Sequence, residues 1–251
     1  MRVGANGIDL HYDIVGDGEP LLWLHGFLGC GADWRHVFPT PPSGYRLIAP
    51  DLRGHGASGA PASGRFSFRE AGGDIHALLE HLGIARVRAI GLSGGGITLL
   101  HLASSHRASI EAMVIVSAPP YFPEQARAIQ RQTSEALLGE AAMAHMRRSH
   151  TRGEPQIQQL LAWSRALADD YDDVAFTPPR LSTISADTLI VFGDSDPFYP
   201  VSLAMELHAG IPRSRLWVVP GGGHGPVFGA DAPRFSEIAL GFLGKPSRVE
   251  R

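Results

Sequence analysis

A serine between glycines is the sharpest chemical signal in this chain. Ser93 stands in the G-L-S-G-G segment 91–95, directly after the apolar run 87–90 and directly before an apolar stretch. A serine hydroxyl is a poor nucleophile until a base takes its proton. A sharp turn from a strand into a helix would expose that hydroxyl, and Gly91 and Gly95 would remove the side chains that crowd such a turn. The segment therefore predicts a nucleophilic serine.

The base and the acid that this serine needs follow the last two apolar runs. His224 lies in a loop of glycine and proline after the run 216–219, and such a loop can deliver an imidazole to a neighbouring strand. Asp194 and Asp196 follow the run 189–192. We favour Asp196 as the acid, because it lies farther beyond the strand end and the next residue, a proline, stiffens its turn. Asp194 is expected to bond the loop backbone.

Acyl transfer also needs donors for the negative charge that develops on the carbonyl oxygen, each worth about 3–4 kcal/mol. The backbone N–H groups of Gly94 and Phe27 are the expected oxyanion hole, Phe27 lying in the loop after the run 21–24. Gly26 would let this loop bend close to the serine. His25 either holds the loop by a hydrogen bond or is an ordinary structural histidine.

Alternating elements must position these residues. Short apolar runs predict strands covered on both faces, and the longer stretches between them predict helices. The expected architecture is an α/β fold, a mostly parallel central sheet flanked by helices. The expected strands are 10–15, 21–24, 45–49, 87–91, 113–116, 189–192 and 216–219, and the expected helices are 68–82, 94–105, 201–209 and 231–243.

The stretch 121–186 breaks this alternation. It holds helical pieces at 123–138 and 156–167 but no strong strand, and it is too long for an ordinary loop. We interpret it as a small helical cap, with 1–120 and 187–251 forming the core domain; the alternative is a pair of ordinary crossover helices. The tail 245–251 is expected to be frayed.

Taken together, these segments resemble the α/β-hydrolase superfamily. The resemblance rests on the H-G-F turn 25–27, the P-D-L-R-G-H-G-A-S segment 50–58, the Ser93 turn, the G-x-x-D segment 193–196 and the loop at His224. It spans nearly the whole chain except the helical insertion. The chain order serine, aspartate, histidine is also the order of this superfamily.

The resemblance implies a fold and a triad more firmly than a substrate. In that superfamily the segment 50–58 is chiefly a structural turn, so Asp51, Arg53 and His55 are assigned no catalytic role. Its haloalkane dehalogenases and epoxide hydrolases carry an aspartate where this chain has Ser93. Those two reactions are therefore disfavoured.

Composition excludes several other classes. The length of 251 residues suits one large α/β domain or two small ones, and the chain is 44% hydrophobic with a formal net charge of −3. The absence of a basic run argues against nucleic-acid partners. No metal or nucleotide motif is present, so no cofactor is expected. No apolar stretch reaches the ~18–20 residues that cross a bilayer, and no secretory signal is visible, so the expected location is cytoplasmic, away from membranes.

The remaining histidines and the single cysteine are expected to be structural or solvated. Cys30 cannot form an internal disulfide and is expected to be a small buried residue, or else to line the entrance of the site. The histidines expected within packed or surface helices are His76, His81, His101 and His106, and those expected in mostly solvated helical stretches are His145, His150 and His208.

The leading hypothesis is a serine hydrolase that cleaves a small carboxylic ester or lactone through an acyl-enzyme. The alternatives are a C–C bond hydrolase, a perhydrolase or lyase with the same triad, and a slow-turnover ligand-binding sensor. An exposed apolar cap face would permit a homodimer. The expected substrate-binding residues are Phe27, Tyr121, Phe122, Trp163, Phe198 and Val227, with Tyr171, Phe176 and Tyr199 as further candidates.

Overall fold

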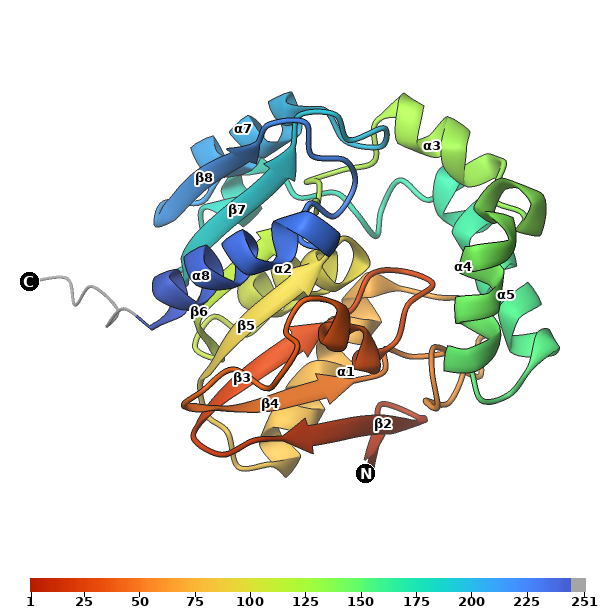
Figure 1. The fold of residues 1–251 in the computed structure, drawn as a ribbon, viewed down its shortest axis with the longest axis horizontal. Helices are drawn as coiled ribbons and strands as arrows, with labels where there is room; N and C mark the ends of the chain where they lie inside the picture. The colour runs from red at the N-terminus through yellow and green to blue at the C-terminus, as the bar shows by residue number, and fades with distance from the viewer. Residues whose placement is uncertain (245–251) are drawn as a thin grey trace, which may run out of the picture.

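A single eight-stranded sheet forms the centre of the computed structural model, which describes residues 1–244 (Figure 1). The strand order is β1-β2-β4-β3-β5-β6-β7-β8. The pairs β1–β2 and β2–β4 are antiparallel and all later pairs are parallel, as the sequence predicted. The strands are β1 Arg2–Ala5, β2 Ile8–Val15, β3 Glu19–Leu24, β4 Tyr45–Pro50, β5 Val87–Leu92, β6 Ile110–Val116, β7 Asp187–Gly193 and β8 Ser214–Val219.

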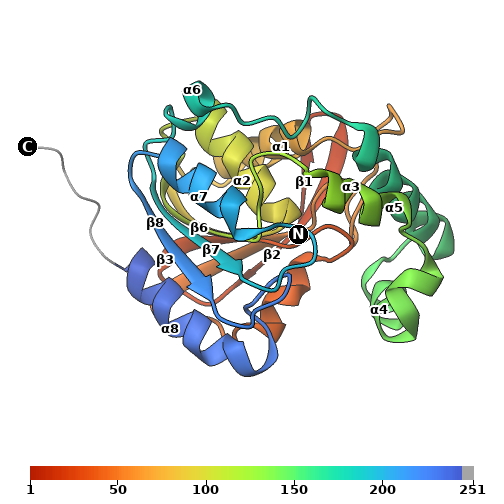
Figure 2. The same cartoon turned by 90° about the horizontal axis from the view of Figure 1, so that it is seen from above.

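Helices cover both faces of the sheet (Figure 2). Helices α1, α2 and α7 cover one face, and α8 covers the other. The α-helices are α1 Phe68–His81, α2 Gly94–Ser105, α3 Glu124–Arg131, α4 Glu135–Ser149, α5 Glu154–Ala166, α6 Pro178–Leu181, α7 Val201–Gly210 and α8 Ala232–Leu243. Short 3-10 helices are η1 Gly31–His36, η2 Leu167–Asp169 and η3 Gly229–Asp231.

The central strands are apolar on both sides because each side meets a layer of helices. In β6 the side chains of Met113 and Ile115 belong to the core under α1 and α2, while Val114 and Val116 belong to the core under η1 and α8. This explains the near-continuous apolar runs from which the strands were predicted. The strand β1 was not predicted, because its R-V-G-A sequence is short and lies at the sheet edge.

Helices α3, α4 and α5 lie beyond the carboxyl ends of the parallel strands, at the right of Figure 1. They lie within the segment 121–186, which was predicted to be a cap and is called the cap below. The helical piece expected at 123–138 is in fact two helices, α3 and α4. The break occurs because Ser134 acts as the N-cap of α4, its hydroxyl accepting a hydrogen bond from the Leu137 N–H. The helix α8 begins at Ala232, one residue later than expected.

Buried polar contacts fasten the cap to the core. The Asp173 carboxylate accepts hydrogen bonds from the Phe68 N–H at 2.6 Å and the Ser67 hydroxyl at 2.8 Å, at the start of α1. A negative charge at a helix N-terminus is stabilised by the unpaired N–H groups there. The Trp163 indole N–H donates to the Gly64 carbonyl at 2.8 Å. The end of the cap therefore has a defined position over the core. The predicted fraying of 245–251 falls outside the described residues.

Candidate active site

Ser93 occupies the turn between β5 and α2 with φ +48° and ψ −111°. A positive φ is costly for a residue with a side chain and persists only where its surroundings hold it. Here the Ser93 N–H donates to the Val116 carbonyl at 2.7 Å. The two glycines are required by close approach, because a Cβ on Gly91 would lie 2.6 Å from the Gly95 oxygen, and one on Gly95 would lie 2.3 Å from the Leu24 oxygen.

An unbroken hydrogen-bonded chain leads from this serine to a buried carboxylate. The Ser93 Oγ lies 3.0 Å from His224 Nε2, and His224 Nδ1 lies 2.9 Å from Asp196 Oδ2. A carboxylate accepts only, so Nδ1 carries the proton and donates, which leaves Nε2 free to accept from the serine hydroxyl. The Asp196 side chain is fully buried, whereas the imidazole is partly exposed.

The two candidate carboxylates have different neighbours. The other oxygen of Asp196 accepts from the N–H groups of Phe198 at 2.8 Å and Tyr199 at 3.2 Å, which fix the carboxylate toward His224. Asp194 is exposed, and its carboxylate accepts from the Gly221 N–H at 2.7 Å. It thus braces the loops after β7 and β8, in agreement with the structural role that was expected.

A further serine, missed in the sequence, steadies the histidine loop. The Ser117 hydroxyl accepts from the Gly225 N–H at 3.2 Å, one residue after His224. Ser117 is fully buried and also has a positive φ of +47°. Its signal in the sequence is weak, a single polar residue directly after the apolar strand β6.

The loop after β3 approaches the start of α2. The Phe27 backbone nitrogen lies 3.1 Å from the point that a Cβ on Gly94 would occupy. Gly94 is the first residue of α2, where backbone N–H groups have no partner within the helix. This proximity is compatible with the oxyanion hole predicted from Gly94 and Phe27.

His25 holds the same loop. The Leu52 N–H donates to His25 Nε2 at 2.9 Å, so the proton of the neutral ring is on Nδ1, which donates to the Gly26 carbonyl at 2.8 Å. The hydrogen-bonding role considered for His25 is therefore correct. The ring is fully buried between β3 and the segment 50–58.

His150 corrects one expectation. Its ring is buried rather than solvated, with Nδ1 accepting from the Gly56 N–H at 2.9 Å and Nε2 donating to the Leu28 carbonyl at 3.0 Å. Burial lowers the pKa of His150 and favours the neutral ring that these bonds require. The end of α4 is thereby attached beside Phe27.

The predicted structural segment 50–58 makes structural contacts. The Asp51 carboxylate accepts from the Gly31 N–H at 2.7 Å and the Ala57 N–H at 2.8 Å, and the Arg53 guanidinium forms two hydrogen bonds with the buried Asp74 carboxylate. Cys30 is buried as expected, and burial raises the pKa of its thiol to about 12, so that it stays protonated at neutral pH.

A cavity of about 160 Å³ lies over Ser93, between the core and the cap. Of the predicted substrate-binding residues, Phe27, Phe122 and Phe198 line it, and so does Tyr199. The other lining residues are Leu28, Phe68, Ser93, Gly94, Ile97, Ile129, Gln130, Thr133, Leu137, Leu138, Ser164, Leu167 and His224.

Three of the predicted substrate-binding residues do not line this cavity. Tyr121 is exposed, and its hydroxyl donates to Glu206. Trp163 is buried and packs against Gly54, and Val227 is buried in the core under α8. Their aromatic or apolar character reflects packing and surface contacts. The further candidates Tyr171 and Phe176 also lie outside the lining, exposed and buried respectively.

A polar wall on the cap side of the cavity escaped the sequence analysis. It consists of Gln130, Thr133 and Ser164. The two hydroxyls lie 3.0 Å apart and bond each other, whereas the buried side-chain oxygen of Gln130 has no hydrogen-bond partner among residues 1–244. Among the lining residues, His224 alone has a side chain that can carry a positive charge.

Comparison with known proteins places these features in a wider context. A family model described as "alpha/beta hydrolase fold" matches residues 19–165. Serine hydrolase BPHL of Mus musculus is 31% identical over an alignment of 241 positions, which covers 89% of this chain and 79% of that protein. A soluble epoxide hydrolase of Corynebacterium sp. (strain C12) is 37% identical over 115 residues, or 46% of this chain. The chain spans only 40% of the length of that epoxide hydrolase.

The fold has solved counterparts. A meta-cleavage product hydrolase of Pseudomonas fluorescens IP01 superposes with a TM-score of 0.79 and 23% sequence identity, covering 97% of each chain. Within residues 1–244, no helix combines the length and apolar character needed to traverse a membrane.

Proposed function

The chain belongs to the α/β-hydrolase family, and we propose that it is a serine hydrolase cleaving a small carboxylic ester or lactone through an acyl-enzyme. The observation that carries the proposal is the hydrogen-bonded chain from Asp196 through His224 to Ser93, with distances of 2.9 and 3.0 Å. An imidazole held in one tautomer beside a serine hydroxyl can take the serine proton during attack.

The proposed reaction assigns one step to each group. The Ser93 oxygen attacks the carbonyl carbon while its proton passes to Nε2 of His224, and the Asp196 carboxylate stabilises the resulting imidazolium. The proton then passes to the leaving alkoxide as the acyl-enzyme forms. Water then attacks the acyl carbon and gives one proton to Nε2 of His224. That proton passes to the Ser93 oxygen as the bond to the acyl carbon breaks and the carboxylic acid is released.

The oxyanion hole of the proposal consists of two backbone N–H groups. Those of Gly94 and Phe27 would donate to the negatively charged oxygen of both tetrahedral intermediates. The Phe27 nitrogen is close to Gly94, and hydrogen bonds of His25 hold the Phe27 loop, which supports this role. Donors held in place before the reaction need no reorganisation when the charge develops.

The cavity favours a small, neutral acyl group with a hydrogen-bond donor. Its volume of about 160 Å³ is small beside the ~300–1,000 Å³ of pockets for drug-sized ligands. Because no Lys or Arg lines it, an anionic group would be desolvated there without a counter-charge. The Gln130 side chain lines the cavity, and a turn of its amide would let the unpartnered oxygen accept a hydrogen bond from a substrate hydroxyl.

Two alternatives are less well supported. Epoxide hydrolysis, the activity in the name of one relative, conflicts with the serine at the proposed nucleophile position. C–C bond cleavage by the same triad would suit a dienoate, but such an acid lacks a cationic partner in the cavity lining. Hydrolysis of uncharged esters is therefore the better proposal.

Replacing the nucleophile tests the proposal. We expect Ser93→Ala to lower kcat for p-nitrophenyl butyrate by about 10⁴-fold or more and to abolish fluorophosphonate labelling. The exposed Ser185 supplies the control, since Ser185→Ala should leave both readouts unchanged. Circular dichroism checks that both variants fold. Normal turnover by folded Ser93→Ala protein would refute the mechanism.

Gln130 tests the proposed acyl group. We expect wild-type protein to favour p-nitrophenyl 3-hydroxybutyrate over p-nitrophenyl butyrate in kcat/KM. In Gln130→Leu this preference should fall by about tenfold, since a hydrogen bond contributes about 1 kcal/mol or somewhat more. Equal ratios in the two proteins would remove Gln130 from substrate recognition while leaving the triad mechanism intact.

A further inference from the structure

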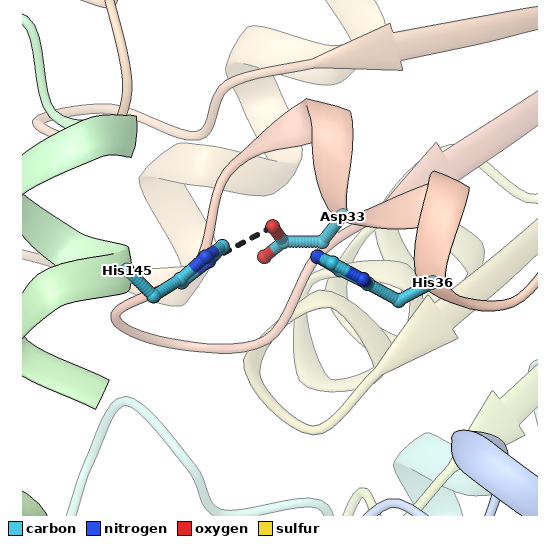
Figure 3. A group of neighbouring side chains, drawn as sticks. All are labelled: Asp33, His36 and His145. Atoms are coloured by element: carbon cyan, nitrogen blue, oxygen red, sulfur yellow. Dashed lines mark ion pairs between the residues drawn. The ribbon is translucent and has the colours of Figure 1, made fainter. Parts of the chain in front are cut away.

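Two histidines and an aspartate meet where η1 of the core faces α4 of the cap (Figure 3). Asp33 and His36 belong to η1 on the core, and His145 belongs to α4 on the cap. One potential ligand atom from each residue lies within 4.8 Å of the other two. The His145 Nε2 lies 3.1 Å from Asp33 Oδ1, and Figure 3 shows the His36 ring on the other side of the carboxylate.

We propose that Asp33, His36 and His145 bind one first-row transition cation of the Zn²⁺ type. Imidazole nitrogens favour Zn²⁺, Ni²⁺ or Cu²⁺ over Mg²⁺ and Ca²⁺, which prefer an all-oxygen set. Two imidazoles and one carboxylate also match the ligand set of known three-ligand zinc sites that leave a fourth position to water. Tetrahedral ligands about 2.0–2.1 Å from Zn²⁺ lie about 3.3 Å apart, so these side chains need only a small closing movement.

The carboxylate is already oriented for this role. Asp33 Oδ2 accepts a hydrogen bond from the Cys30 N–H at 2.9 Å, which holds the other oxygen toward His145. Such bonds behind a metal ligand fix its direction and strengthen the site. The His145 Nε2 also lies 3.4 Å from the Ser149 hydroxyl, on the next turn of α4.

A cation from solvent can reach the three residues. They lie among the lining of an open cavity of about 610 Å³, next to Phe27 and Phe228. His36 is exposed and His145 is partly buried, so neither imidazole is held within the core. The alternative interpretation is a simple ion pair between His145 and Asp33. Such a pair would not need His36, whereas a cation site would use His36 as a ligand.

The cation would join the cap to the core. The ligands on η1 and α4 are more than a hundred residues apart in the sequence, and the segment before η1 contains Phe27, which lines the cavity over Ser93. A bound cation would therefore restrain α4 relative to the Phe27 loop. The binding proposal does not depend on the proposed hydrolase activity.

Titration with ZnCl₂ tests the site directly. The full chain, without a histidine tag and after treatment with a chelator, is titrated by calorimetry and its Tm is measured with and without Zn²⁺. We expect one Zn²⁺ per chain. At a free Zn²⁺ concentration of a hundred times Kd, Tm should rise by about 5–10 °C.

Matched variants identify the ligands. His36→Gln and His145→Gln should each weaken binding by at least about tenfold, whereas His81→Gln, at an exposed histidine on α1, should bind Zn²⁺ like the wild type. Addition of Zn²⁺ should slow hydrogen exchange in α4 of the wild type and of His81→Gln, which still bind the cation. It should not slow exchange in the variants that have lost binding. The proposal is overturned if the wild type binds no Zn²⁺ below millimolar concentration, or if His36→Gln and His145→Gln both bind as tightly as the wild type.

Discussion

Acid should destabilise this protein, and His101 should account for a measurable part of the effect. His101 is buried in α2, the helix that begins after Ser93. An Arg180 N–H donates to its Nδ1 at 2.9 Å, so Nε2 carries the proton and donates to the Asp173 carbonyl at 2.7 Å. These bonds require a neutral ring. Burial, aided by the Arg180 charge, lowers the pKa of His101 to about 3.

The direction and size of the effect follow from proton binding. Unfolded His101 has an ordinary pKa of about 6.5, so below that pH the unfolded chain binds a proton that the native ring does not. The contribution of His101 to stability is therefore complete above pH 6.5 and is lost as the pH falls toward 3. Between pH 7 and pH 5 the loss is about 2 kcal/mol in the free energy of unfolding, at 1.36 kcal/mol per pKa unit.

Urea denaturation at pH 7 and pH 5 measures this loss. His101→Gln keeps a donor and an acceptor but cannot titrate, so the stability difference between the two pH values should be smaller than in the wild type by about 2 kcal/mol. Carboxylates that also bind protons between pH 7 and pH 5 change the stability of the wild type and of His101→Gln by the same amount, so their effect cancels in the comparison. His81→Gln, at an exposed site, should behave as the wild type. An unchanged pH dependence in His101→Gln would show that the native ring accepts a proton as easily as the unfolded one.

Two further changes probe the triad and its turn. Asp196→Asn should retain the fold but lower kcat by about 10⁴-fold, because an amide facing His224 Nδ1 favours the wrong tautomer; activity within tenfold of the wild type would contradict the assigned role. Gly95→Ala should lower Tm by about 2–12 °C, because its Cβ would lie 2.3 Å from the Leu24 oxygen and overpacking costs about 1–3 kcal/mol. A thermal melt with an unchanged Tm would show that the backbone can move aside.

The hydrogen-bonded arrangement of Ser93, His224 and Asp196 could be predicted because each of the three follows an apolar run. Ser93, Asp196 and His224 follow β5, β7 and β8, whose carboxyl ends meet at one edge of the parallel sheet. Strands of this kind have a strong local signal, so residues at their ends can be placed without knowing the rest of the packing. The same reasoning separated Asp196 from Asp194.

The lining of the cavity over Ser93 could not be predicted in this way, because residue type does not determine which side of a helix faces the cavity. Trp163 and Ser164 are neighbours on α5, and successive residues of an α-helix point about 100° apart. Trp163 packs against Gly54 in the core, whereas Ser164 faces the cavity. Aromatic character had favoured Trp163, which does not line the cavity over Ser93.

Long-range pairs escaped the sequence for a related reason. His145 on α4 and His150, which directly follows α4, belong to one stretch that resembles a solvated surface, yet His150 is buried against Leu28 and Gly56. Nothing in the local sequence pattern indicates that the His150 ring has hydrogen-bond partners more than ninety residues away in the chain. The Asp33 and His36 pair is equally unremarkable until α4 brings His145 beside it.

The groups proposed for catalysis and the polar wall of the cavity come from different parts of the fold. The groups proposed to break the bond belong to the sheet and its loops. The polar wall of the cavity comes from the cap, at Gln130, Thr133 and Ser164. A change in these three residues would alter substrate choice without touching the triad. Two substrates that differ by one hydroxyl therefore test the proposed substrate preference more directly than further comparison with similar proteins.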